Sequence, residues 1–128
     1  MGTGLTRLVA IALVLIGRRH MEIKELVTES HNTATEKGWW DIIKSPLEIY
    51  MLIVSEITEA AECARDIDTE PIWISEVGKP EGEAVELADA VIRIADWFGH
   101  KGWDLEKALR LKMEYNKCRS YRHGNKKY

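Results

Sequence analysis

The sequence predicts an all-α fold, and three observations support this prediction. Apolar residues recur at helical spacing in four separate segments. Proline and glycine residues are few, and they lie between these segments, where they would end helices. No stretch alternates between apolar and polar residues with period two, so we expect no β-sheet. With 128 residues, 45% of them hydrophobic, the chain has the size of one domain and can bury a core.

The first half of the chain predicts two helices. Residues 22–37 carry apolar side chains at helical spacing and form the first. The second begins with a capping box, because Ser45 can cap the helix, Pro46 fits its first turn, and Glu48 lies at the position that reaches back to the cap. This helix is expected to span residues 46–66, with its apolar residues on one side and its acidic residues on the other.

The second half predicts a loop and two further helices. Residues 67–82 contain two prolines and two glycines and are expected to form the loop. The third helix is expected at residues 83–98. Asp104 can cap the fourth, expected at residues 105–119. The tail, residues 120–128, is basic and polar, and we expect it to fray.

The first twenty residues differ from the rest. Residues 8–16 form an apolar run that is too short to cross a bilayer, which needs about 20 residues. Three explanations stay open: a start assigned upstream of the true one at Met21, an additional packing helix, or a weak export signal. We favour the first, and therefore divide the chain into an extension, residues 1–20, and a domain, residues 21–128.

Charge and cysteine content narrow the class of protein. The formal net charge of -3 gives no general electrostatic attraction to nucleic acid, and no segment predicts a membrane partner. Cys63 and Cys118 match no zinc-site spacing, so we interpret them as reduced thiols of a cytoplasmic protein, although the sequence alone leaves a disulfide open.

Two pairs of acidic residues are the strongest indication of chemistry. Glu56 and Glu59 are three residues apart on the second helix, and Glu86 and Asp89 are three apart on the third. Side chains at this spacing share a helix face, so two packed helices would bring four carboxylates together. Clustered carboxylates repel unless a cation compensates them, and oxygen ligands favour Mg²⁺ or Mn²⁺. A solvated acidic face is the alternative interpretation.

The third helix favours a site over a solvated face. Glu86, Asp89, Arg93 and Asp96 fall within a narrow arc, surrounded by apolar residues. We expect Arg93 to pair with Asp89 or with Asp96 rather than to contact a substrate.

One face of the fourth helix is basic. Lys112, Asn116 and Arg119 recur at spacings that place them together, where they could hold phosphate oxygens. Spacing alone favours the simpler interpretation of exposed, solubilising side chains.

The motifs resemble those of the MazG-like nucleotide pyrophosphohydrolases, which belong to the all-α NTP pyrophosphatase superfamily. The family pattern ExxE, a spacer and ExxD is matched by Glu56-Ile-Thr-Glu59 and Glu86-Leu-Ala-Asp89. The stretches 36–40, 78–82 and 112–124 are also similar, so the resemblance covers about residues 22–127. It fits the single-domain members better than the two-domain enzyme.

The resemblance implies a four-helix-bundle-like domain in a homodimer or a dimer of dimers. It implies that a (d)NTP and water are converted to a (d)NMP and pyrophosphate, as in house-cleaning of the nucleotide pool. By the same resemblance, Mg²⁺, with Mn²⁺ as an alternative, is held by Glu56, Glu59, Glu86 and Asp89, with one Glu free to act as a base towards water.

The resemblance also implies substrate contacts: the phosphates at Lys112, Asn116 and Arg119, and the nucleobase near His31 and Trp40. Trp39 is expected only to pack within its loop.

Two other classes of protein could place carboxylates on packed helices. A di-iron helical bundle needs Glu-x-x-His ligand pairs, and the sequence contains none. A non-enzymatic helical metal-binding or interaction module remains the alternative. Phosphoribosyl-ATP pyrophosphatase and dimeric dUTPase share the acidic pattern, but Trp39-Trp40 and the stretch 112–124 resemble them less. The preferred base and sugar do not follow from the sequence.

Overall fold

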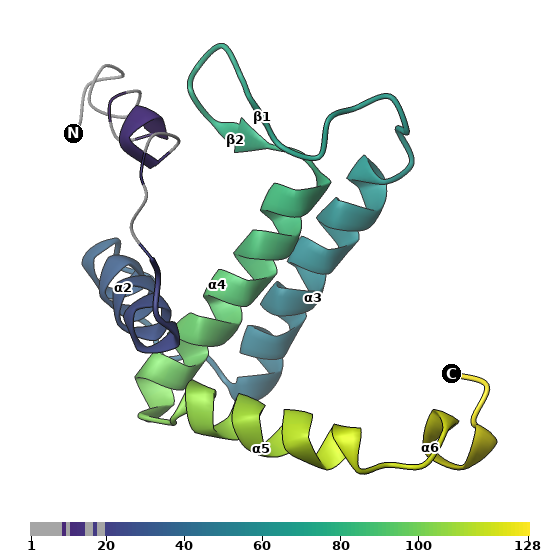
Figure 1. The fold of residues 1–128 in the computed structure, drawn as a ribbon. Helices are drawn as coiled ribbons and strands as arrows, with labels where there is room; N and C mark the ends of the chain where they lie inside the picture. Colours follow the sequence, from purple (N-terminus) through teal and green to yellow (C-terminus); the bar gives the residue numbers. More distant parts are fainter. Residues whose placement is uncertain (1–8, 10, 15–16, 18–19) are drawn as a thin grey trace.

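The computed structural model describes residues 9, 11–14, 17 and 20–128 (Figure 1). The chain in these parts is mainly helical, which confirms the predicted all-α class. The elements follow one another as α2 (Ile23–Glu36), α3 (Pro46–Cys63), β1 (Trp73–Ile74), β2 (Pro80–Glu81), α4 (Glu83–Lys101), α5 (Leu105–Lys117) and α6 (Arg122–Asn125).

The expected helix starts are confirmed by their capping contacts. The backbone N–H of Glu48 donates to the Ser45 hydroxyl (3.3 Å), and the Ser45 N–H donates to the Glu48 carboxylate (2.6 Å), which completes the capping box of α3. The carboxylate of Asp104 caps α5 by accepting from the Lys107 N–H (2.9 Å). These contacts depend on neighbouring residues only, which is why the sequence predicts them well.

Helix α4 lies at the centre and packs against both α2 and α3 (Figure 1). Small residues are buried on the packed helices, since Ala60 on α3 and Ala90 and Ala95 on α4 are almost fully buried. Ile49 and Trp97 supply the larger buried apolar side chains. The close approach of α3 and α4 brings the acidic residues of the two helices near one another.

A glycine sets the distance between α2 and α4. A Cβ atom at Gly99 would lie 2.6 Å from the Cβ of His31, closer than two such atoms approach in practice. Only glycine therefore lets α2 pack this tightly at that turn of α4. Helix α4 also continues through Gly99 to Lys101, three residues beyond the predicted end, and stops at Gly102 in the left-handed conformation.

The expectation of no β-sheet is wrong for one short segment. β1 and β2 pair antiparallel, with Trp73 opposite Glu81 and Ile74 opposite Pro80. Strands of two residues are too short for the alternation on which sequence analysis depends. The hairpin is stabilised instead by its turn, where the Ser75 N–H donates to the Lys79 carbonyl (2.9 Å) and the Lys79 N–H donates to the Ser75 hydroxyl (3.0 Å).

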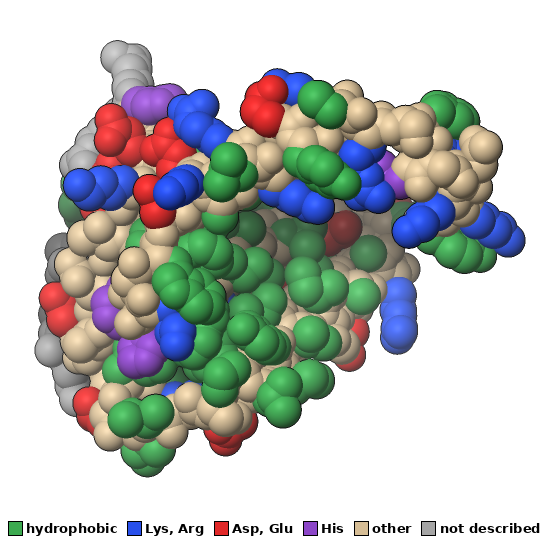
Figure 2. Space-filling model, turned by 90° about the horizontal axis from the view of Figure 1, so that it is seen from below, with side chains coloured by type: hydrophobic (Ala, Val, Ile, Leu, Met, Phe, Trp, Pro, Cys, Tyr) green, Lys and Arg blue, Asp and Glu red, His purple; other side chains and the backbone are tan. Residues whose placement is uncertain are grey.

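Helix α5 runs away from the other helices, so one chain does not complete a four-helix bundle (Figure 1). It contacts α2 only near their ends, and none of its residues is buried. The apolar side of α3 is also largely exposed, including Leu47, Tyr50 and Val54. Figure 2 shows hydrophobic side chains gathered over a broad face of the molecule. Apolar surface of this extent is typical of an interface.

Three remaining expectations concern the ends of the chain and its thiols. Most of the extension, residues 1–20, falls outside the described residues, so its interpretation stays a prediction. The tail, for which the sequence predicts fraying, contains one short helical turn, α6. Cys63 and Cys118 are both free thiols. In the described part of the chain, no helix is both long and apolar enough to cross a membrane.

Candidate functional site

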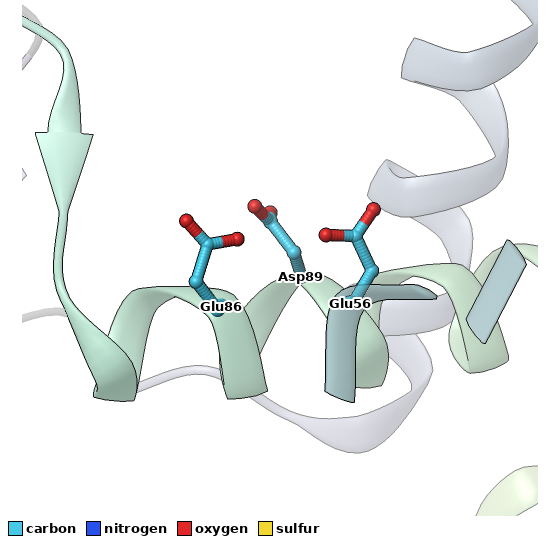
Figure 3. A group of neighbouring side chains, drawn as sticks. All are labelled: Glu56, Glu86 and Asp89. Atoms are coloured by element: carbon cyan, nitrogen blue, oxygen red, sulfur yellow. The ribbon is translucent and has the colours of Figure 1, made fainter. Parts of the chain in front are cut away.

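Three of the four predicted acidic residues come together. Glu56 on α3 and Glu86 and Asp89 on α4 each offer a carboxylate oxygen, and these oxygens all lie within 4.8 Å of one another. Figure 3 shows the three side chains in a row, rising from the two packed helices. Glu59 lies beside Glu86 but outside this group, on a more exposed position of α3. We call Glu56, Glu86 and Asp89 the acidic cluster.

The cluster carries the electrostatic signs of mutual repulsion. Burial, the neighbouring carboxyl of Glu59 and the charges of Asp89 and Glu56 raise the pKa of Glu86. Burial and the charge of Glu56 raise the pKa of Asp89, although Arg93 acts in the opposite direction. Both groups therefore give up their protons less readily than isolated carboxyls. A bound cation would remove this cost, and an all-oxygen donor set fits a hard divalent ion such as Mg²⁺.

Arg93 pairs with Glu56 rather than with the two partners expected from its own helix. Its Nε donates to Oε1 of Glu56 over 2.6 Å, and only 8% of Glu56 is exposed. The expected pairing with Asp89 or Asp96 is therefore wrong, because α3 supplies a closer carboxylate than the neighbouring turns of α4. The pair leaves one oxygen of Glu56 available to the cluster.

A pocket of about 480 Å³ opens beside the cluster. This volume suits a small organic ligand. Its walls combine apolar side chains with several polar ones. It is lined by Met21, Leu26, Glu29, Ser30, Thr33, Ala34, Lys37, Trp39, Trp40, Lys44, Ile49, Leu52, Glu56, Asp89, Ile92, Arg93 and Asp96.

The aromatic wall of the pocket is fixed by one carboxylate. Oδ1 of Asp96 accepts from the indole N–H of Trp40 (2.8 Å) and also contacts Nδ1 of His31 (2.8 Å). Trp40 stacks on His100, with ring centres 3.9 Å apart and planes within 4°. Trp40 lines the pocket, whereas His31 is not among its lining residues and instead contacts Asp96. The expected contacts of both with a nucleobase stay a prediction. Trp39, expected only to pack in its loop, also lines the pocket.

The predicted phosphate contacts lie elsewhere in a single chain. Lys112 and Asn116 lie in the second half of α5, and Arg119 directly follows its cap residue, Cys118; none of the described residues that line the pocket belongs to α5. Lys112 and Arg119 lie instead over the ring of Tyr115, at 5.0 and 5.7 Å. One chain therefore does not bring this basic face to the acidic cluster.

Sequence reasoning missed two residues of the site. Lys79 was part of a matching motif without a role, yet its charge influences the cluster, since Glu86 and Glu59 help Glu81 to raise the pKa of Lys79. His100 follows Asp96 by four residues, so helical spacing could have placed both on one face. No local pattern indicates that Trp40 would stack there.

Comparisons of the chain with protein-family models, with curated proteins and with solved structures find no match.

Proposed function

We propose that the chain is a Mg²⁺-dependent nucleoside triphosphate pyrophosphohydrolase of MazG-like type. The observation that carries the proposal is the convergence of Glu56, Glu86 and Asp89 beside a pocket of nucleoside size. The acidic cluster would hold the anionic end of a nucleotide through a divalent ion, while the aromatic wall would receive the base. The resemblance of the ExxE and ExxD motifs, found from sequence alone, supports the same activity.

The metal would be held by Glu56, Glu86 and Asp89, with Glu59 close enough to join them or to stay free. A divalent ion there would neutralise phosphate charge and increase the acidity of water. The clustered carboxylates favour such an ion because it relieves their repulsion. Mn²⁺ has a similar preference for oxygen and should support activity.

The reaction proposed is attack of water on the α-phosphorus. The oxygen of water forms a bond to the α-phosphorus, and the bond from that phosphorus to the oxygen bridging the α- and β-phosphates breaks. The electron pair stays on the bridging oxygen, which leaves with pyrophosphate, and a proton passes from water to a carboxylate. Glu59 suits this role because it lies beside the cluster on an exposed position.

The base would enter the pocket against Trp40. Asp96 and His100 fix the indole ring from its edge and from one face, so its orientation does not depend on the ligand. Stacking accepts any nucleobase, which fits an enzyme that cleans the nucleotide pool. A cytoplasmic location follows from that role.

A homodimer or a dimer of dimers would complete the molecule. The exposed apolar side of α3 and the isolated helix α5 support this part of the proposal, because one chain leaves both uncovered. A neighbouring subunit could also bring Lys112, Asn116 and Arg119 to the phosphates, as the resemblance implies.

The alternative is a helical metal-binding module without activity. Pyrophosphate release separates the two, measured on the full chain with canonical and modified dNTPs and NTPs. The proposal predicts release that needs Mg²⁺ or Mn²⁺ and stops when EDTA removes the ion. Stabilisation by these ions without turnover of any nucleotide would favour the module.

A further inference from the structure

In the described part of the chain, Arg93 and Lys79 are two basic residues whose charges lower the pKa of Asp89 in the acidic cluster. They lie at opposite ends of the row of carboxylates. Arg93 follows Asp89 by one turn of α4, whereas Lys79 pairs with Glu81 (3.1 Å), which precedes the first turn of α4. Figure 3 shows the hairpin at the Glu86 end of the row and Glu56, the partner of Arg93, at the other.

Arg93 marks the end of the row that opens into the pocket. Its Nε is engaged by Glu56, but its two terminal amino groups have no hydrogen-bond partner among the described residues. Arg93 also lines the pocket. The guanidinium group can therefore keep Glu56 in place and still donate to an anion at the pocket mouth.

Ser30 adds one polar group to this pocket. The residue is only 8% exposed and lines the pocket. Its hydroxyl can donate a hydrogen bond to a ligand or accept one from it. The apolar and aromatic walls beside Ser30 suit the nucleoside, so this end of the row takes the uncharged part of the ligand.

Lys79 marks the other end, which is open to solvent. The hairpin turn holds its backbone through hydrogen bonds with Ser75, while its side chain remains 65% exposed. Its backbone is therefore fixed, while its ammonium group lies near the surface in an ion pair with Glu81. It compensates the negative charge of the row now, and it can exchange Glu81 for a more highly charged anion.

We propose that the triphosphate lies along this row in one direction, with the α-phosphate at Arg93 and the departing pyrophosphate at Lys79. This inference rests on the proposed function. When water attacks the α-phosphorus, the bond to the bridging oxygen breaks and its electron pair moves onto pyrophosphate, at the Lys79 end. The nucleoside monophosphate keeps the oxygen of water and remains in the pocket at the Arg93 end. Lys79 thus contacts the leaving group, and Arg93 contacts the phosphate that is attacked.

Product binding tests this direction. Calorimetry on the full chain with Mg²⁺ would measure the affinities of pyrophosphate and of a nucleoside monophosphate separately. Lys79→Gln should weaken pyrophosphate binding about five- to tenfold, as expected for the loss of one charged hydrogen bond at an exposed position, and leave the monophosphate unchanged. Arg93→Lys keeps the positive charge but loses the planar pair of guanidinium donors. It should weaken binding of the monophosphate more than binding of pyrophosphate. Lys107→Gln, on α5, is the matched control and should change neither affinity.

The outcomes separate this inference from the proposed function. Unchanged pyrophosphate binding in Lys79→Gln, with weakened binding in Lys112→Gln, would overturn the direction and leave the hydrolase intact. If Lys79→Gln weakened binding of the monophosphate and Arg93→Lys weakened binding of pyrophosphate, the triphosphate would lie in the opposite direction. This result would also overturn the inference. The expected pattern in a chain that hydrolyses no nucleotide would support the placement of the phosphates and overturn the hydrolase.

Discussion

Replacing Asp89 by Asn should make the metal-free protein more stable and remove its response to Mg²⁺. The substitution keeps the size of the side chain and deletes one negative charge from a cluster whose oxygens lie within 4.8 Å. Because burial and the charge of Glu56 raise the pKa of Asp89, its ionised form already costs free energy in the fold. The variant removes this cost and with it one proposed ligand.

Coulomb's law gives the size of the effect. Two unit charges 4.8 Å apart repel by about 0.9 kcal/mol in bulk water and about 3.5 kcal/mol at an effective dielectric constant of about 20. The cluster is partly open to solvent, and Arg93 offsets some repulsion, so the lower value applies. We expect Asp89→Asn to stabilise the metal-free chain by roughly 1 kcal/mol, which corresponds to a rise in Tm of about 3–6 °C.

Thermal unfolding with and without Mg²⁺ measures both effects. An ion present at about 100 times its Kd should add about 2.7 kcal/mol to the native chain, a rise in Tm of roughly 10 °C. Asp89→Asn should lose most of this rise. Asp68→Asn, in the exposed loop, serves as the matched control and should behave as the native chain. A Tm several degrees lower in metal-free Asp89→Asn, or an undiminished response to Mg²⁺, would refute the reasoning.

Three further predictions follow from the same cluster and the exposed apolar surface. Glu59→Gln should abolish turnover while the helical circular dichroism stays unchanged; full activity in this variant would rule out Glu59 as the base. The pKa of Glu86 is raised in the folded chain, so the ionised carboxylate lowers the stability of the fold and the protonated carboxyl does not. The stability present at low pH is therefore lost as pH rises through the folded pKa. Glu86→Gln should therefore exceed the native Tm at pH 7, and this excess should shrink towards pH 4.5; a pH-independent difference would contradict the assignment. Light scattering should give a dimer or tetramer at micromolar concentration, and Val54→Asp, on the exposed side of α3, should shift it towards monomer; a monomeric native chain would contradict the proposed assembly.

The sequence predicted best what depends on neighbouring residues. Ser45 and Glu48 are three residues apart, so their capping box could be identified without knowledge of the fold. The spacing within each acidic pair likewise fixed which face of its helix the carboxylates share. The two pairs come together only because α3 packs on α4. The buried small residues of these helices are the feature of the sequence that indicates such packing.

What sequence analysis missed depends on contacts between distant segments. Arg93 had two acidic neighbours on its own helix, yet Glu56, 37 residues away, is its partner, and no local pattern distinguishes these possibilities. The hairpin escaped notice because its strands have only two residues each. The stack of Trp40 on His100 depends on how α2 approaches α4, which Gly99 sets by leaving room for His31.

The central claim is the position of the bond that breaks, and the products formed in isotopically labelled water test it most directly. The full chain would be incubated with a nucleoside triphosphate and Mg²⁺ in H₂¹⁸O, and mass spectrometry would locate the label. Attack at the α-phosphorus predicts nucleoside monophosphate carrying one ¹⁸O atom together with unlabelled pyrophosphate. Nucleoside diphosphate with orthophosphate, or label found in pyrophosphate, would contradict the proposed function.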